Sequence, residues 1–128
     1  MSPSGFLSID KPRGWTSHDV VAWVRRRTRQ RQVGHTGTLD PEAVGVLVLC
    51  LGQATRLSQY VTALPKRYRA QVQLGVGTAT YDAAGEVLAL SDASGVTQNQ
   101  VEAALAAFRG SIRQVPPAFS ALKQRGQP

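Results

Sequence analysis

The stretch of this sequence that most constrains the fold reads Gly34-His35-Thr36-Gly37-Thr38-Leu39-Asp40-Pro41. It places a carboxylate, an imidazole, hydroxyls and two glycines close together, and glycine permits positive φ angles and close approach to a ligand. Pro41 biases Asp40 towards an extended or turn conformation. Because an apolar run follows directly, over residues 44–49, we expect Asp40 on a shaped loop beside a buried strand. Leu-Asp-Pro on its own is more typical of an ordinary turn.

Hydrophobic periodicity predicts strands on both sides of this stretch. They cover residues 5–10, 46–51, 66–74, 86–90 and 111–115. Strand 46–51 is apolar on both faces, as in the centre of a sheet, and strand 66–74 has the clearest alternation. The sequence therefore predicts an α+β fold with a mixed, mainly antiparallel sheet and helices packed on it.

Three helices are expected between these strands. The first has Ser17 as its N-cap and Trp23 in the core, the second follows Gly52 and ends at Pro65, and the third begins with a Thr97–Gln100 capping box and stops at Gly110. The residues expected on their buried faces are Val20, Val21 and Val24, then Ala54, Leu57, Val61 and Leu64, and finally Val101, Ala104, Leu105 and Phe108.

Charge is unevenly distributed along the 128 residues, which suffice for one compact domain. The net charge is +7; residues 1–69 hold 11 Lys/Arg and 4 Asp/Glu, whereas residues 70–128 hold 4 of each. Five arginines gather near the end of the first helix, at 25, 26, 27, 29 and 31, where cations suit either the helix C-terminus or phosphates. This basic half favours a nucleic-acid partner, although an arginine-rich soluble surface explains the composition equally well.

Several other classes of function and location are disfavoured. The single cysteine, Cys50, cannot form an internal disulfide, so a reducing cytoplasm is expected, and we find neither a signal peptide nor a membrane span. The two histidines and one cysteine make no zinc set, and residues 75–85 lack the Lys-Ser/Thr of a phosphate-binding loop. We therefore expect no metal and no membrane partner.

Several spaced motifs resemble one known family, the bacterial tRNA pseudouridine synthases of the TruB type. Residues 34–47 resemble its active-site motif, and the aspartate that is essential there corresponds to Asp40. Residues 9–17 resemble the family's opening, where the lysine that corresponds to Lys11 lies beside the active-site floor. Lys66-Arg67-Tyr68 matches its Lys-x-Tyr element, whose tyrosine stacks on the target base.

Two further segments extend the resemblance over almost the whole chain. Thr78, Thr80, Asp82 and Gly85 match a Thr-x-Thr-x-Asp-x-x-Gly turn, and residues 116–123 resemble a Pro-Pro-x-Tyr/Phe-Ser-Ala-x-Lys element. The resemblance implies a partial pseudouridine synthase-type fold, with residues 1–128 as the N-terminal part of the catalytic domain. On this resemblance we expect the rest of that domain and a C-terminal RNA-binding domain to be missing from these 128 residues, and therefore weak or no activity from this chain alone.

The implied function is isomerisation of the T-loop uridine of tRNA, position 55, to pseudouridine. Asp40 would be the catalytic carboxylate, no cofactor would be needed, and the partner would be the T-stem-loop. The residues expected around the substrate are Tyr68, His35, Lys11, Gly37, Thr38, Asp82 and Arg67.

Ordinary structural roles stay open for three of these residues. Lys11 could be a solvated turn lysine, His35 a hydrogen-bonded loop histidine and Tyr68 a half-buried sheet tyrosine. Two other functions also stay open for the chain, namely a non-catalytic basic RNA-binding or remodelling module and an inert fragment.

Overall fold

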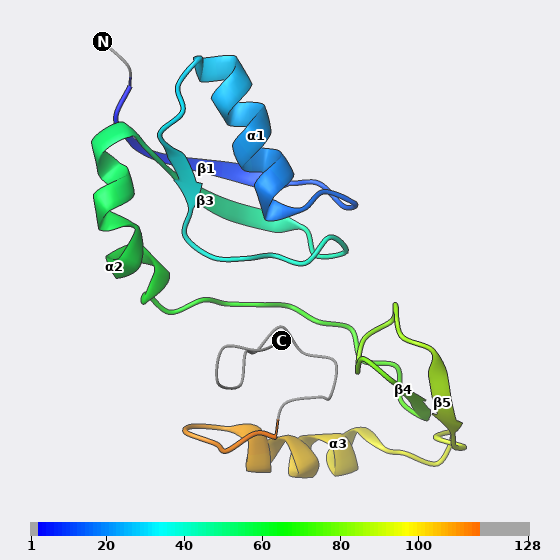
Figure 1. Cartoon of the computed structure of the whole chain (residues 1–128). Helices are drawn as coiled ribbons and strands as arrows, with labels where there is room; N and C mark the ends of the chain where they lie inside the picture. Colours follow the sequence, from blue (N-terminus) through cyan, green and yellow to red (C-terminus); the bar gives the residue numbers. More distant parts are fainter. Residues whose placement is uncertain (1–2, 116–128) are drawn as a thin grey trace. The chain divides into compact units, whose positions relative to one another are not determined.

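The computed structural model describes residues 3–115, which belong to two compact units that meet at Tyr68 and Arg69 (Figure 1). The first unit contains β1 (Gly5–Lys11), α1 (Ser17–Thr28), β2 (Val33–His35) and β3 (Gly45–Leu51). A 3-10 helix, η1 (Gly52–Leu57), and α2 (Ser58–Thr62) follow. The second unit contains β4 (Val76–Thr78), β5 (Val87–Leu90), α3 (Gln98–Leu105) and the 3-10 helix η2 (Ala106–Phe108). Helices with antiparallel strands confirm the predicted α+β class.

The three strands of the first unit form an antiparallel sheet in the order β1-β3-β2. β3 is the central strand, as its two-sided apolar pattern predicted, and it pairs with β1 from Gly5–Leu51 to Lys11–Gly45. β2 pairs with the other edge, with His35 opposite Leu49. This register places the end of β1 next to the beginning of β3, at the same end of the sheet. The loop that follows β2 leads back to β3 at this end.

One face of this sheet packs against α1 to form the core. The helix contributes Val20, Val21 and Val24, and the sheet contributes Val33, Leu47, Leu49 and Leu51, all buried. Side chains alternate between the faces of a strand, so Val46 and Val48 lie on the opposite face, where Val46 is 71% exposed. The central strand therefore has one face for the core and one face available for a site.

The start of α1 differs from the sequence prediction by one residue. Thr16, not Ser17, is the N-cap: its hydroxyl accepts a hydrogen bond from the Asp19 backbone at 3.0 Å, and the Asp19 carboxylate accepts from the Thr16 backbone at 2.8 Å. Ser17 is instead the first helical residue and is buried. The prediction that Trp23 is a core residue was wrong, because its indole is 38% exposed and lies beside Arg27.

The second unit is a short antiparallel hairpin of β4 and β5, followed by α3. Its predicted capping box is confirmed, since Thr97 and Gln100 bond reciprocally at the start of α3. The buried face predicted for this helix is not confirmed, because α3 contains no buried residue and Phe108, which follows it, is 67% exposed. Of the four residues expected on the buried face of the helix before Pro65, only Ala54 is buried, while Leu57 and Leu64 are 48% and 58% exposed.

Two predicted strands are missing from the described residues. Residues 66–73 belong to neither a helix nor a strand and Leu74 lies in a turn, and residues 111–115 form no strand. Strands need a neighbour to which their backbone groups can bond, and no described strand lies beside either segment. The alternation of residues 66–74 predicted a strand, but it could not reveal whether a partner strand is present. Residues 116–123, which carry the last motif, lie outside the described residues. No described helix is long and apolar enough to cross a bilayer.

The capping box of α1 makes stability depend on pH. Hydrogen bonds from Thr16 lower the pKa of Asp19 below its ordinary value of 3.8. A carboxyl with a lowered pKa in the folded state stabilises that state above its ordinary pKa, and this contribution is lost as the pH falls through the lowered value. We expect Asp19→Asn to flatten the decline of stability below about pH 4, measured by urea unfolding at a series of pH values.

Thr97→Val is a matched control for this measurement, because it removes a cap whose partner, Gln100, does not titrate. It should lower stability without changing the pH slope. If Asp19→Asn left the dependence of stability on pH unchanged, the Asp19 carboxylate would not be the source of that dependence.

Candidate active site

Asp40 lies in the loop between β2 and β3, with its side chain exposed to solvent. Pro41 and Glu42 form the corner of a tight turn that the Asp40 carbonyl closes by accepting from the Ala43 backbone at 3.0 Å. The shaped loop predicted for Asp40 is therefore present. Its shape does not come from glycines in left-handed conformations, because neither Gly34 nor Gly37 has a positive φ.

Ser17 fixes the residue before Asp40. Its hydroxyl accepts from the Leu39 backbone N–H at 2.8 Å and lies 3.2 Å from the Leu39 carbonyl, to which it donates. Ser17 is 3% exposed, so these bonds are shielded from water. Both backbone groups of Leu39 are thereby tied to the first turn of α1.

Lys11 fixes the residue after Asp40. Its side chain is fully buried, and its ammonium donates to the carbonyls of Trp15 at 2.6 Å, Pro12 at 3.0 Å and Pro41 at 3.3 Å. The Pro41 carbonyl also accepts from the Gly14 backbone at 2.8 Å. Because an ammonium has three protons, these carbonyls use its whole donor capacity, and the geometry is that of a residue that supports the loop.

His35 and Thr36 shape the other end of the loop. The His35 Nδ1 lies 3.0 Å from the Gly37 carbonyl. A carbonyl can only accept, so Nδ1 carries the proton and Nε2 is left for another partner. Thr36 is buried and donates from both its backbone and its hydroxyl to the Val48 carbonyl, at 3.0 and 3.1 Å.

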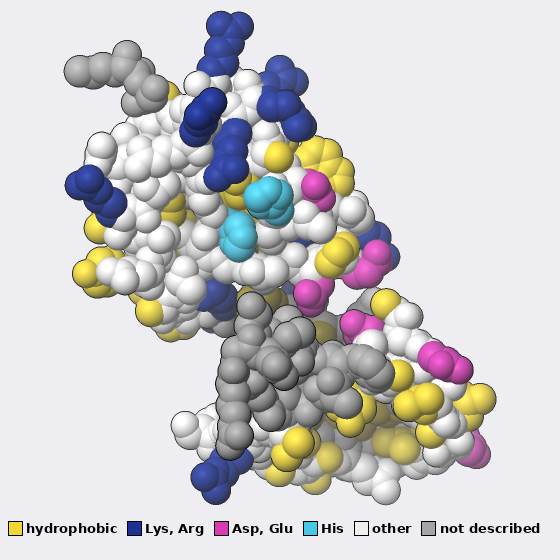
Figure 2. All heavy atoms as spheres, viewed as in Figure 1, with side chains coloured by type: hydrophobic (Ala, Val, Ile, Leu, Met, Phe, Trp, Pro, Cys, Tyr) yellow, Lys and Arg dark blue, Asp and Glu magenta, His cyan; other side chains and the backbone are white. Residues whose placement is uncertain are grey.

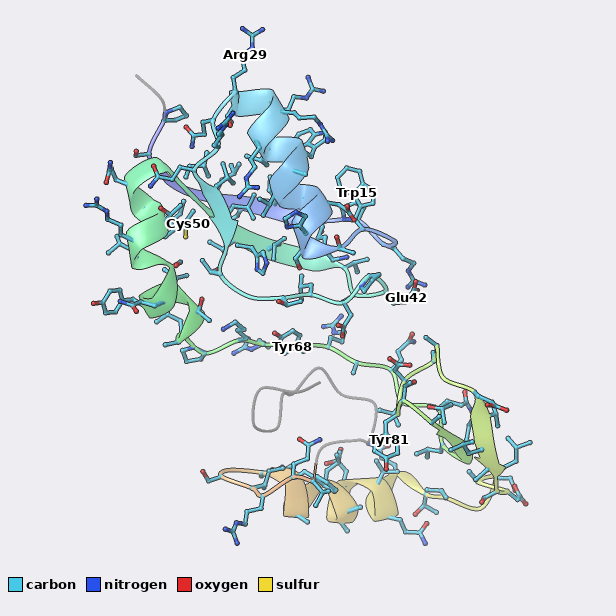
Figure 3. The ribbon with its side chains drawn as sticks, in the orientation of Figure 1. Trp15, Arg29, Glu42, Cys50, Tyr68 and Tyr81 are labelled. Atoms are coloured by element: carbon cyan, nitrogen blue, oxygen red, sulfur yellow. The ribbon has the colours of Figure 1, made fainter. Side chains whose placement is uncertain are left out.

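A pocket of about 290 Å³ opens on the sheet face opposite α1. Gly37, Thr38 and Leu39 of the loop line one side, and β3 forms the floor. The segment after α2 adds Arg67 and Tyr68. Figure 3 shows the position of Tyr68. The remaining lining residues are Thr36, Val46, Leu47, Val48, Val61, Leu64, Pro65 and Lys66.

This pocket brings together four residues that the sequence placed around a substrate: Gly37, Thr38, Arg67 and Tyr68. Asp40 directly follows the lining residue Leu39, and His35 directly precedes Thr36. The floor is apolar, the rim carries the cations of Lys66 and Arg67, and the Tyr68 ring is 67% exposed. Such a surface suits a flat, partly apolar ligand that is attached to an anion.

Asp82 belongs to the second unit, where its carboxylate closes a turn. It accepts from the Thr80 hydroxyl at 2.6 Å and the Ala84 backbone at 3.0 Å, and these bonds lower the pKa of Asp82. The structure thus gives this residue the turn-forming role that its motif indicated.

Sequence reasoning missed the part that Ser17 plays. The signal was the Thr16–Ser17 pair, because one hydroxyl suffices for the N-cap and the second is then free for a distant partner. The residues of the second helix that line the pocket, Val61 and Leu64, were expected instead on a buried face.

Among the described residues, no three His, Cys, Asp or Glu side chains are grouped as a metal site. Burial raises the pKa of the Cys50 thiol, so this cysteine is a core residue.

Ser17→Ala tests the link between α1 and the loop. The variant leaves the Leu39 N–H without its partner, which should cost about 1–3 kcal/mol of unfolding free energy. Ser8→Ala, at an exposed position on β1, should stay within about 0.5 kcal/mol. Equal urea midpoints for the two variants would show that the link contributes nothing.

The family model for "TruB family pseudouridylate synthase (N terminal domain)" matches residues 25–128. The tRNA pseudouridine synthase B of Arthrobacter sp. (strain FB24) is 51% identical over 124 residues, which are 97% of this chain and 40% of that protein. Its counterpart from Symbiobacterium thermophilum is 52% identical over 123 residues, which are 96% of this chain and 41% of that protein.

A solved structure gives a similar result. A chain in the crystal structure of a Cbf5-Nop10-Gar1 complex matches with a TM-score of 0.61 and 31% identity, and the match covers 93% of this chain and 31% of that chain. The present chain therefore spans about two fifths of the length of the curated relatives it matches.

Proposed function

The chain belongs to the TruB family of pseudouridylate synthases, and from this premise we propose that it supplies the catalytic aspartate loop of a tRNA pseudouridine synthase. The substrate is the T-loop uridine of tRNA, at position 55, and Asp40 is the catalytic carboxylate. The observation that carries the proposal is the position of Asp40: its backbone is fixed at both neighbours, its side chain is exposed, and the preceding residue, Leu39, lines a pocket of about 290 Å³.

The reaction requires little besides a positioned carboxylate. The glycosidic bond between N1 and the sugar breaks, the uracil turns, and a bond forms between C5 and the same sugar carbon. C5 then loses its proton and N1 gains one, so the product is an isomer of the substrate. No oxidant, reductant or cofactor takes part. A carboxylate can serve as the nucleophile at the sugar carbon or as the base for a proton, and both routes require it beside the sugar of the bound uridine.

The pocket explains how a uridine could reach this carboxylate. A base inside a helical stack offers no access, so it must be extruded before it reacts. Tyr68 provides an exposed aromatic ring on which an extruded pyrimidine can stack. Lys66 and Arg67 lie beside it, where they can bind the phosphates that flank the nucleotide. Gly37 and Thr38 face the same space from the loop, and His35 supports them through the Gly37 carbonyl.

Lys11 and Ser17 take no part in the chemistry in this proposal. Lys11 acts through the Pro41 carbonyl and Ser17 through the Leu39 backbone, so both are positioning residues. Holding a reactive group in place before substrate binds removes an entropic cost from the reaction.

Asp40→Asn tests the proposal in a chimera in which this chain replaces the matching N-terminal part of the Arthrobacter relative. Release of tritium from tRNA labelled at uridine C5 reports formation of the new C–C bond. We expect the variant to lose about 10³-fold or more in activity and to keep its affinity for tRNA.

Glu42→Gln is the matched control, because Glu42 lies two residues away in the same loop and pairs with Arg13 at 3.6 Å. It should keep activity. Tritium release by Asp40→Asn at the unchanged rate would refute the catalytic assignment and leave a basic RNA-binding module as the function of this chain.

Tyr68 can be tested by separating its ring from its hydroxyl. Tyr68→Ala removes the stacking surface, worth about 1–3 kcal/mol, and should lower kcat/KM of the chimera roughly 5- to 150-fold. Tyr68→Phe keeps the ring and should retain the stacking part of that energy. If both variants lose the same amount, the hydroxyl and not the ring is what the substrate uses.

A further inference from the structure

Four exposed arginines outside the candidate site gather at the C-terminal end of α1 and in the turn after it. We call Arg26, Arg27, Arg29 and Arg31 the arginine patch. Figure 2 shows Lys and Arg side chains concentrated on this part of the first unit, and Figure 3 shows Arg29 extending from the end of α1. The neighbouring Arg25 differs from them, because its Nη2 donates to the Val33 carbonyl at 2.8 Å and ties α1 to β2.

The stability of the first unit does not account for this patch. Cations favour the last turn of a helix, but the effect fades beyond it, and Arg29 and Arg31 lie after the last helical residue, Thr28. Like charges so close together repel. Within residues 3–115 the ion pairs are Arg13–Glu42 and Arg109–Glu102, so no described carboxylate neutralises the patch. Its charge therefore remains available for an external anion.

The structure fixes the side chain of one patch residue and shows the backbone conformation of another. The Arg27 guanidinium lies 5.3 Å from the centroid of the Trp23 ring, which holds a flexible side chain against an aromatic face. Arg29 is the C-cap of α1 and adopts a left-handed conformation with φ of 53°. The Arg27 guanidinium, held against the indole, keeps a planar set of donors that fits a phosphate through two parallel hydrogen bonds.

The patch is separated from the pocket. α1 packs on the sheet face that bears Leu47, Leu49 and Leu51, whereas the pocket opens on the face of Val46 and Val48. Ser17, at the start of α1, contacts the Asp40 loop, and the 12 residues of the helix place its other end about 18 Å away. One nucleotide cannot contact both places.

We propose that the arginine patch is a second RNA contact, which binds backbone phosphates of a segment distinct from the nucleotide in the pocket. The choice of RNA as the polyanion rests on the proposed function. Contacts of this kind carry no sequence preference and depend strongly on salt. The patch therefore contributes affinity and orientation for a folded RNA, while the pocket contributes the reaction.

The test compares Arg26→Gln/Arg27→Gln in the full 128-residue chain with Arg56→Gln/Arg113→Gln, which removes the same charge from exposed positions outside the patch and outside the ion pairs of the described residues. Binding of an unmodified tRNA transcript is measured between 50 and 200 mM salt, and circular dichroism verifies folding. The patch variant should bind more weakly, and its slope of log affinity against log salt should fall by about two. The control pair should keep the slope of the unchanged chain. Arg26→Lys/Arg27→Lys should keep the slope but lose part of the affinity, because lysine lacks the planar fork.

Equal slopes for the patch variant and the control pair would overturn this proposal. So would a patch variant that lost binding to anionic phospholipid vesicles while it kept its affinity for tRNA. The proposed function fails separately, through unchanged tritium release by Asp40→Asn, and that result would leave the salt slopes as they are.

Discussion

The geometry of the site depends on the buried ammonium of Lys11. A charge removed from water is costly unless its hydrogen-bonding capacity is met, and here three carbonyls meet it. Two of these carbonyls belong to the segment just after β1, and the third belongs to Pro41, 30 residues further along the chain. Any movement of the Pro41 corner away from β1 would leave a buried cation short of an acceptor. The loop that carries Asp40 is therefore rigid for an electrostatic reason, although Asp40 itself forms none of these bonds.

The central strand divides the first unit into a part for stability and a part for function. Leu47, Leu49 and Leu51 pack against α1, and the side chains that alternate with them, Val46 and Val48, line the floor of the pocket. Because both sets of side chains come from one strand, packing that fixes β3 against α1 also fixes the pocket floor. Ser17 adds the same coupling through α1, since the helix that fills the core also holds Leu39. The loop is thus attached to the core from both sides.

The sequence predicted what neighbouring residues determine and missed what distant residues determine. The Thr97–Gln100 cap and the Val20, Val21 and Val24 stripe follow from local spacing, and both were correct. Strand 66–74 failed because pairing needs a second strand, and alternation cannot reveal whether one is present. The prediction for Asp40 rests on a motif of consecutive residues. The Ser17–Leu39 link joins residues 22 positions apart, so no local pattern encodes it, and the spare hydroxyl beside Thr16 was its only trace.

Asp40 and Glu42 show why two acids in one loop are not equivalent. Glu42 forms an exposed ion pair with Arg13, whereas none of the ion pairs among the described residues includes Asp40. A solvated, unpaired carboxylate is a weak nucleophile and a weak base, because water stabilises its charge. On the proposed function, the extruded uridine itself covers the pocket, displaces that water and brings its sugar to a carboxylate whose backbone cannot retreat. Binding of the correct base is then what activates the aspartate, and an RNA that cannot extrude its uridine leaves Asp40 hydrated and inert.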